Sequence, residues 1–444
     1  MTPRRATDQD KAGRRVIIVG GGFSAVAAAA QLLARGAAHV TLIERGAAFG
    51  PGLAYGPAAG AHLLNTPAAR MSAIEGDGEH FVRWLARHGA GEGYVRRALY
   101  GAYLRDTLRD AARTRWLRPS RLECVRGAVI ACRREGDHWL VTLASGRAYA
   151  AQAVILALGH PAPAPPAPFE AHDLIGAWDT RAQARLRKGD VLLAGSGLTM
   201  MDVAIALAAR RRGGTIYALS RRGRTPQAHL SLPGPPAAAA AEPPLELSAA
   251  LHQFRACAGQ DWRPALDALR PHAPEIWARL GPERQGRFLR HLRPWWDSHR
   301  HRAPPETAAQ FAALLAEGRV RILSGEIASA IRERGVWRLQ HRQRGSRVRH
   351  RLETVGVINC TGADLALARS QDALVRQLLD EGLARAPANG LGFDVDSENR
   401  LRDKAGAAQP NLFVLGPLAA GVFWETTAAP ELRARAAAIA RALD

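Results

Sequence analysis

The stretch Val16-Ile-Ile-Val-Gly-Gly-Gly-Phe-Ser-Ala25 decides how the N-terminal part of the chain folds. Four apolar residues bounded by polar sequence are typical of a buried parallel strand. The glycine-rich turn leads into an alanine-rich segment that predicts a helix to about residue 34, and a second strand is predicted over residues 39–43. The sequence therefore predicts a βαβ unit of the kind that binds dinucleotides.

The spacing of small residues in this turn is Gly-x-Gly-x-x-Ala. The first glycine permits a tight turn, the second lets the backbone approach a pyrophosphate, and a small third residue lets helix and strand pack closely. The helix N-terminus then offers N–H groups and partial positive charge to phosphates. Glu44, after the second strand, suits the ribose hydroxyls of an adenosine. The residues predicted to bind this first cofactor are Gly20, Gly22, Phe23, Ser24, Ala25, Glu44 and Arg45.

A second βαβ unit is predicted from residue 191 onward, with a strand, a Gly-x-Gly turn, a helix over about 199–212 and a strand over 215–219. Met200 stands where a small residue is usual, so the helix is expected to sit slightly differently. The second strand ends in arginines instead of an acid, which favours the 2′-phosphate of NADPH over NADH. The alternative is that these arginines are merely solvated. The predicted binding residues are Gly195, Gly197, Thr199, Ser220, Arg221 and Arg222.

The wider pattern predicts an α/β protein with two Rossmann-like dinucleotide-binding domains, β-meander excursions and a helical insertion. Meanders are predicted over 122–158 and 320–362, each ending in a buried strand and a glycine. A proline-rich linker follows the first of them. The predicted domains are the first part of the first dinucleotide-binding domain over 1–165, the second such domain over 166–345 with the helical insertion at about 225–318, and the second part of the first domain over 346–444.

The composition is that of a globular enzyme: 444 residues, 47% apolar and 23% charged. No run approaches the roughly 18 to 20 apolar residues that span a bilayer, so no membrane association is expected. The opening residues carry basic side chains but no apolar stretch, which argues against a secretory signal. Single cysteines without a Cys-x-x-Cys pair predict neither a zinc ribbon nor a dithiol redox centre, and they fit a cytoplasmic protein. They are Cys124, Cys132, Cys257 and Cys360.

The formal net charge of +21 raises the question of nucleic-acid binding. Only three of the 61 basic residues are lysine, which indicates a preference for arginine codons, and the arginines are spread along the chain. We therefore expect no nucleic-acid partner. An anionic cofactor or substrate accounts for part of the charge.

Two dinucleotide units joined by meanders resemble the FAD- and NAD(P)-binding flavoproteins with two Rossmann domains. More narrowly, the chain is similar to a bacterial family of FAD/NAD(P)-binding proteins with relatives among N-hydroxylating monooxygenases. Glycines and a threonine that end the two excursions, or that lie near the C-terminus, match signposts of the superfamily. These are Gly159, Thr361, Gly362 and Gly416. The segments that carry the narrower resemblance are 50–55, 62–65, 69–71, 99–104, 197–202, 293–302 and 423–428.

This resemblance implies FAD in the first unit and NAD(P)H, favoured as NADPH, in the second. It implies that Asn65 and Met71 lie close to the isoalloxazine, although Asn65 could equally cap the turn before Pro67. Thr426 and Thr427 precede the last helix, whose N-terminal dipole would stabilise negative charge on the reduced flavin. A plain helix cap is the alternative.

The segment 295–302 combines two tryptophans with two His-Arg pairs and could bind an anionic small-molecule substrate. His299 or His301 would be the general acid near pH 7, alongside Asn65 as the third predicted catalytic residue. Structural salt bridges are the alternative for this segment. The two histidines lack a third ligand nearby, so no metal is predicted.

These inferences predict an oxidoreductase that takes hydride from NADPH and passes electrons through FAD to oxygen or a small organic substrate, leaning to monooxygenation. The rival prediction is an FAD-carrying redox sensor or binding protein with little turnover.

Overall fold

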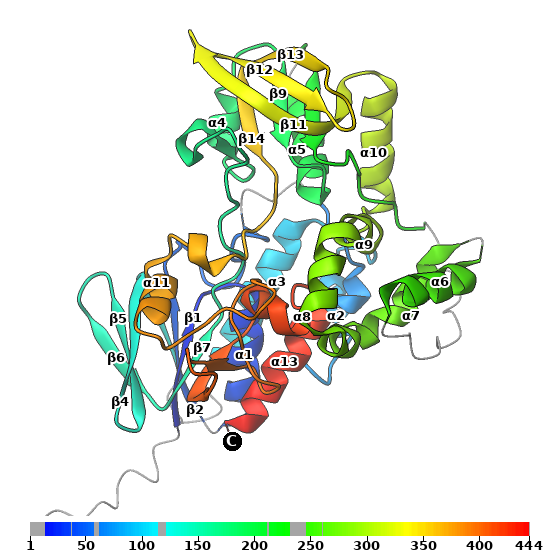
Figure 1. Cartoon of the computed structure of the whole chain (residues 1–444). Helices are drawn as coiled ribbons and strands as arrows, with labels where there is room; N and C mark the ends of the chain where they lie inside the picture. The colour runs from blue at the N-terminus through cyan, green and yellow to red at the C-terminus, as the bar shows by residue number, and fades with distance from the viewer. Residues whose placement is uncertain are drawn as a thin grey trace, which may run out of the picture. The chain divides into compact units, whose positions relative to one another are not determined.

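The computed structural model describes residues 14–36, 38–56, 62–113, 121–210, 213–230, 246–259 and 261–443. They divide into two compact units (Figure 1). Unit 1 comprises Met1–Ala61, Thr66–Pro161 and Leu365–Asp444, and unit 2 comprises His62–Asn65 and Ala162–Asp364. The opening segment, the end of the helix expected to reach residue 212, and the Pro/Ala stretch over 231–245 lie outside the described residues.

The described part of unit 1 is built on a six-stranded sheet in the order β15-β16-β7-β1-β2-β3. Its strands are β1 (Arg14–Val19), β2 (Ala38–Glu44), β3 (Leu122–Arg126), β7 (Ala153–Leu156), β15 (Arg400–Arg402) and β16 (Ala408–Val414). All neighbours are parallel except β15 and β16. The apolar run of β1 occupies the middle because it is buried on both faces.

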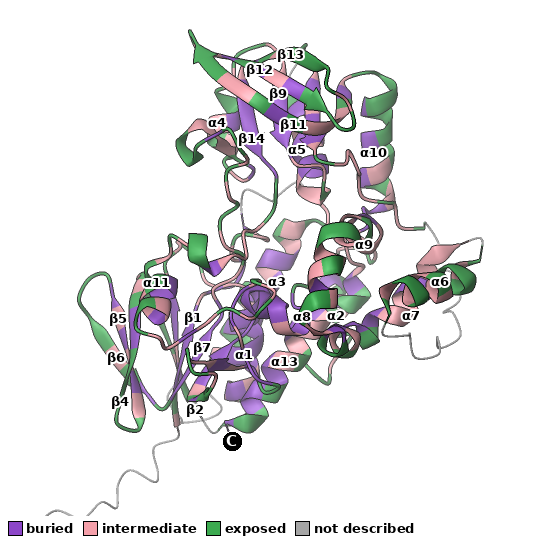
Figure 2. Cartoon of the chain, in the orientation of Figure 1, coloured by how far each residue is buried: buried purple, intermediate pink, exposed green. Residues whose placement is uncertain are grey.

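Helices cover this sheet, and α1 is the most deeply buried of those at its centre. Its alanines allow close approach of α3 and α13, and nine of its residues are buried (Figure 2). The helices of unit 1 are α1 (Phe23–Arg35), η2 (Ala68–Arg70), α2 (His80–Arg87), α3 (Arg97–Ala112), η5 (Leu367–Arg369), α11 (Ala373–Asp380), η6 (Pro417–Ala419), α12 (Ala420–Phe423) and α13 (Ala429–Ala442). A three-stranded antiparallel meander adds β4 (Val129–Glu135), β5 (His138–Leu143) and β6 (Ala148–Ala151).

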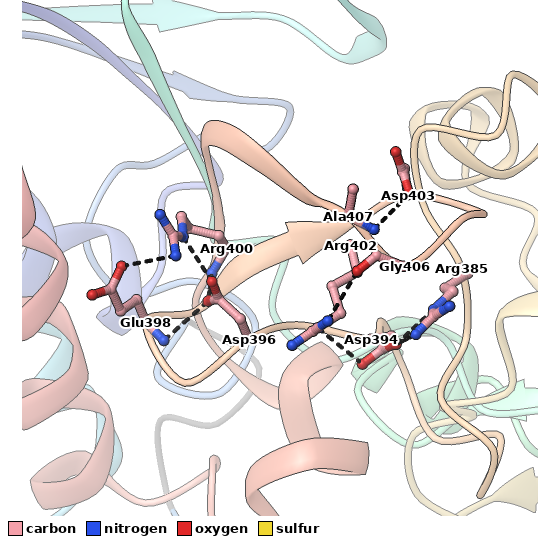
Figure 3. Close-up of polar contacts among 9 residues, drawn as sticks. All are labelled: Arg385, Asp394, Asp396, Glu398, Arg400, Arg402, Asp403, Gly406 and Ala407. Atoms are coloured by element: carbon pink, nitrogen blue, oxygen red, sulfur yellow. Dashed lines mark hydrogen bonds and ion pairs between the residues drawn. The ribbon is translucent and has the colours of Figure 1, made fainter.

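The sheet edge at β15 is held by ion pairs and turn hydrogen bonds (Figure 3). Arg400 Nε lies 2.7 Å from Asp396 Oδ2, and Arg385 Nε lies 2.6 Å from Asp394 Oδ2. Charged side chains on a short edge strand discourage pairing with another chain. We read this network as structural.

Unit 2 contains, in its described residues, a seven-stranded sheet in the order β13-β12-β11-β10-β9-β14-β8. The strands are β8 (Ile175–Gly176), β9 (Val191–Ala194), β10 (Ile216–Ser220), β11 (Val320–Glu333), β12 (Val336–Gln343), β13 (Arg349–Thr354) and β14 (Gly356–Asn359). The five from β11 to β8 in that order are parallel, and β12 and β13 form an antiparallel meander on the extension of β11. Short helical turns η3 (Ala171–Asp173) and α4 (Thr180–Ala184) precede β9.

One strand lies in a different unit from the one the sequence indicated. The buried strand near residue 356 was expected to begin the returning part of the first domain. Instead, β14 pairs in parallel with β9, with Gly356 opposite Val191, and unit 2 continues to Asp364. The physical reason is that the meander returns to the sheet from which it left.

The expected helical insertion is present, but it ends earlier than predicted. α5 (Leu198–Arg210) and α10 (Pro305–Ala316) pack together, and Phe311 and Leu314 of α10 belong to the Rossmann core. Thus α10 is the crossover helix between β10 and β11. The insertion proper holds α6 (Leu247–Ala258), α7 (Trp262–Leu269), η4 (Arg270–His272), α8 (Ala273–His291) and α9 (Arg293–Arg300). Over the described residues, no helix combines the length and apolar character needed to cross a membrane.

Candidate functional site: two dinucleotide cradles

The turn after β1 requires glycine at its first position. Gly20 has φ +118°, and a Cβ there would lie 2.1 Å from the Ala157 carbonyl oxygen. The Gly20 N–H donates to the Ile43 carbonyl oxygen (2.8 Å), so both neighbouring strands of the sheet hold the turn. Gly159, at the end of the strand segment beside it, also has positive φ (72°). The chain is thus forced to turn at the carboxyl edge of the sheet, where dinucleotides bind in such folds.

A second glycine-rich loop closes against this turn. The Gly50 N–H donates to the Gly21 carbonyl oxygen (2.7 Å), and a Cβ on Gly52 would lie 3.0 Å from the Gly22 Cα. Gly22 is the N-cap of α1 and has no side chain to cap it. The start of α1, with Phe23, Ser24 and Ala25 in its first turn, is therefore flanked by bare backbone. This geometry suits a diphosphate.

The motif at 99–104 supports this loop from behind. A Cβ on Gly101 would lie 2.4 Å from the Tyr55 carbonyl oxygen, so α3 can touch the loop only through glycine. The Tyr100 hydroxyl donates to the Met71 carbonyl oxygen (2.8 Å), and the Ala73 N–H donates to the Tyr103 hydroxyl (2.9 Å). Burial raises the pKa of Tyr100 well above its usual value, so its hydroxyl stays a donor. The segment carrying Met71 is fixed in this way.

A cavity opens beside Glu44, at the far end of the same turn. Its volume is about 670 Å³, including the part open to solvent. Its walls come from the ends of β1 and β2, the turn between β3 and β4, and the start of α11. Glu44 Oε1 accepts from the Gly46 N–H (2.5 Å), and Arg45 Nη1 lies 3.0 Å from Asp372 Oδ2. The lining residues are Val19, Gly20, Ile43, Glu44, Arg45, Gly127, Ala128, Val129, Ile130, Leu158 and residues 371–374.

The C-terminal part of unit 1 adds Gly416 and the threonines before α13. Gly416 has φ +128°, and a Cβ on it would lie 3.5 Å from Ser24 Oγ, so it belongs to the same neighbourhood as the start of α1. Thr426 is fully buried, and among the described residues its Oγ1 has no hydrogen-bond partner. Thr427 is exposed. A buried hydroxyl without a partner costs free energy unless a ligand or water satisfies it.

Unit 2 repeats the turn of unit 1. Gly195 has φ +121°, and a Cβ on it would lie 2.3 Å from the Cys360 carbonyl oxygen, while its N–H donates to the Leu219 carbonyl oxygen (2.7 Å). Gly197 precedes α5 and Thr199 lies in its first turn, and Met200 of the same turn is fully buried in the core. On the neighbouring strand end, Thr361 donates to Asn359 Oδ1 (2.7 Å), and Gly362 has φ +87°.

The ends of β9, β10 and β11 bring hydroxyls and guanidinium groups together. Ser196 donates to the Arg224 carbonyl oxygen, and its Oγ lies 2.7 Å from Ser220 Oγ. Ser220 pairs in register with Ser324, whose carbonyl oxygen accepts from the Arg344 N–H (3.1 Å). Arg344, in the turn between β12 and β13, thereby lies at the same sheet edge as the predicted arginines.

Four arginines gather here without a carboxylate partner among the described residues: Arg221, Arg222, Arg224 and Arg344. The Arg224 guanidinium lies 3.1 Å from the centre of the Trp295 ring, and its Nε is buried and unpaired. Desolvation, followed by the charges of Arg222 and Arg344, lowers the pKa of Arg224. Such mutual repulsion is relieved by an anion. Sequence reasoning missed Arg224 and Arg344; no local pattern marks Arg344, because only strand pairing brings it here.

Asn65 belongs to the short segment of unit 2 that interrupts unit 1 in the sequence. Its carbonyl oxygen lies 3.1 Å from His229 Nε2. Nearby in the same segment, His62 Nδ1 lies 3.7 Å from Asp202 Oδ1, and both side chains are nearly buried. These two contacts explain why the segment groups with unit 2.

The two histidines predicted as general acids lie at the end of α9 and differ in their surroundings. His299 Nδ1 lies 2.8 Å from the Trp295 carbonyl oxygen, and its ring packs edge-on against Trp262 (4.5 Å between centroids). Loss of solvent around the ring, together with the Arg300 charge, lowers the pKa of His301 to about 4. This low pKa favours the neutral form of His301 near pH 7, and the role of general acid stays a prediction for both histidines. Within the described residues no group of three or more metal-ligating side chains occurs.

The two cradles and the sheets that carry them define a flavoprotein-type fold with two Rossmann domains, as predicted. The family model described as FAD-NAD(P)-binding matches residues 17–161. No curated protein sequence matches the chain.

Solved structures show the same architecture over nearly the whole chain. L-lysine 6-monooxygenase from Pseudomonas syringae is 17% identical, with a TM-score of 0.71 over 97% of this chain and 99% of that one. The ornithine N-hydroxylase of Kutzneria sp. 744 is 16% identical, with a TM-score of 0.67 over 97% and 99%. The cadaverine monooxygenase from Erwinia amylovora is 13% identical, with a TM-score of 0.70 over 98% and 95%. The likeness in fold to N-hydroxylating monooxygenases is thus confirmed.

Proposed function

We propose that the protein is an NADPH-dependent FAD oxidoreductase that hydroxylates a small amine. The observation that carries the proposal is the repeated glycine turn. The same forced backbone appears in both units, beside an acid in unit 1 and beside four uncompensated arginines in unit 2. One cradle suits an adenosine with free ribose hydroxyls, and the other suits one that carries a 2′-phosphate.

The residues of unit 1 fit FAD. Gly20, Gly22 and the first turn of α1 would hold the diphosphate, and Glu44 would accept hydrogen bonds from the ribose. The unpaired Thr426 hydroxyl and the N-terminus of α13 would face the flavin ring, with Met71 fixed beside it through Tyr100. When bound, the flavin supplies the transfer of electrons between nicotinamide and acceptor.

The residues of unit 2 fit NADPH. Gly195 and Gly197 would let the diphosphate approach the start of α5, with Thr199, Thr361 and Gly362 around it. Ser220 and the four arginines would bind the 2′-phosphate, since guanidinium groups form strong hydrogen bonds with phosphate. Arg221 is exposed and free to turn toward a ligand.

Amine hydroxylation is supported by two proteins that share this fold at TM-scores near 0.7. Their names identify them as monooxygenases that act on lysine and on cadaverine. The four isolated cysteines also speak against a dithiol acceptor. His299 could contact an anionic group of the substrate. The alternative function, a redox sensor with little turnover, would use the same two cradles.

The test first measures FAD binding and reduction, and then identifies the molecule that accepts the electrons. Purified protein should be yellow and should bleach without oxygen faster with NADPH than with NADH. On aeration with ¹⁸O₂ and a set of small amines, mass spectrometry should find one amine gaining labelled oxygen. Bleaching with release of hydrogen peroxide alone, under every amine tried, would leave a reductase. Slow bleaching with every nicotinamide would favour the sensor.

A further inference from the structure

The cavity beside Glu44 has a wall contributed by a distant part of the chain. Besides strand ends and the β3–β4 turn, the start of α11 lines it through residues 371–374. Asp372 is separated from Arg45 by 327 residues. Both residues line the cavity, and their ion pair is the only salt bridge between side chains of these two walls that the described residues show.

The two halves of this ion pair differ in freedom. Asp372 Oδ1 caps α11 by accepting from the Leu374 N–H (3.1 Å) and the Val375 N–H (3.3 Å). The carboxylate cannot turn away without uncapping the helix. The Arg45 side chain is 66% exposed and contacts Asp372 from the end of β2. Arg45 is therefore the movable half.

The far end of α11 is tied down independently. On the meander, the Cys132 N–H donates to Gln377 Oε1 (2.9 Å). Arg133 Nε, also on the meander, lies 3.0 Å from both carboxylate oxygens of Glu381, which follows α11. Leu374, Val375 and Leu378 are buried in the core. Opening the Arg45 contact therefore leaves α11 in place and changes only the mouth of the cavity.

We propose that the Arg45–Asp372 pair is a clasp across the adenosine end of the cofactor site and slows the release of FAD. The inference rests on the proposed function, because it assigns this cavity to the adenosine half of FAD. It identifies a flavin dinucleotide as the ligand retained, since FMN lacks the half that the clasp covers. The predicted site residue Arg45 then acts on the cofactor through Asp372.

The expected effect is small and sensitive to salt. Exposed ion pairs contribute roughly 0.2 to 1 kcal/mol, which converts to a change of about 1.4-fold to fivefold in rate. Mobile ions screen exposed charges, so FAD release from the unaltered protein should speed up as salt is raised. A variant without the clasp should lose most of this dependence.

The experiment measures FAD release from the holoprotein by the rise of flavin fluorescence after dilution. The variants are Arg45→Ala, Asp372→Asn and the double variant; asparagine retains the helix cap. The matched control is Arg133→Ala, which breaks the ion pair at the other end of α11. Each single variant should release FAD about 1.4-fold to fivefold faster at low salt. The double variant should release it no faster than either single variant. The control and the affinity for FMN should be unchanged.

Three outcomes would overturn the clasp. Release could be unchanged in both single variants. It could rise in the control as much as in Arg45→Ala, which would mean general loosening of α11. The effects could add in the double variant, which would mean that Arg45 contacts the cofactor without Asp372. If the unaltered protein binds no FAD at all, the proposed function fails instead, so the two failures are distinguishable.

Discussion

Arg344 offers the sharpest test of the second cradle, because nothing in its local sequence marks it. We predict that Arg344→Ala raises KM for NADPH and leaves KM for NADH unchanged. The Arg344 N–H donates to the Ser324 carbonyl oxygen, one strand from Ser220, so the side chain extends from the sheet edge that carries the other arginines. The substitution removes the side chain and keeps this backbone contact.

The magnitude follows from the charge and exposure of the site. A hydrogen bond to a charged group contributes about 1.5 to 3 kcal/mol. Arg344 is exposed and shares its task with three other arginines, so we take the lower limit. About 1.5 kcal/mol corresponds to a roughly tenfold rise in KM for NADPH.

The assay is steady-state nicotinamide oxidation at fixed oxygen, with each nucleotide in turn. The control is Arg349→Ala, which removes an equal charge from the same hairpin at β13, where the guanidinium donates to Gln340 Oε1 (3.1 Å). A long-range field would act through both residues, whereas a phosphate contact acts only through Arg344. Equal rises in KM for NADPH and NADH, or equal effects of the two variants, would refute the reasoning.

Three further outcomes are expected. Gly195→Ala places a Cβ 2.3 Å from the Cys360 carbonyl oxygen, so bleaching of the flavin by NADPH should be lost. The FAD content, measured by the absorption spectrum, should be retained. Loss of both would contradict separate binding sites for the two nucleotides. Tyr100→Phe leaves the Met71 carbonyl unpaired, which should lower the free energy of unfolding by about 1 to 3 kcal/mol, measured by urea denaturation of the flavin-free protein. A decrease below about 0.5 kcal/mol would mean that the carbonyl has another hydrogen-bond partner. Burial and the Arg302 charge lower the pKa of His229 from 6.5 to about 4, so between these pH values the unfolded chain binds one proton more than the folded protein. The free energy of unfolding should therefore fall as the pH drops from about 6.5 to 4, and it should fall less steeply in His229→Gln. Equal pH dependence of the free energy of unfolding in the two proteins would exclude His229 as a cause.

The parts of the fold that sequence reasoning predicted correctly are those whose signals are local. The buried runs of β1 and β9, their glycine turns and the helices after them are specified within some thirty residues, because strand, turn and helix each leave a pattern in sequence. The meanders were visible for the same reason, through alternation and turn residues.

What local patterns cannot specify is which strand a segment joins. β14 has the apolar run of any buried strand, so only its pairing with β9 assigns it to unit 2. For the same reason, local patterns did not reveal the positions of Arg344 and Asp372. Strand pairing brings Arg344 to its site, and the segment that carries α11 brings Asp372 to the cavity. The pKa of His301 is lowered chiefly by burial, which the sequence around it does not show.

The insertion that carries α6 to α9 leaves and rejoins the crossover at one point. Ala303 donates its N–H to the Gln227 carbonyl oxygen (2.8 Å), and His229 donates its N–H to the Ala303 carbonyl oxygen (2.9 Å), so the two ends lie side by side. Because its two ends are adjacent, the insertion can become longer or shorter, or be replaced, while β10 and β11 keep their parallel pairing. The insertion can therefore change during evolution without any change to the strand order of the sheet from which it departs.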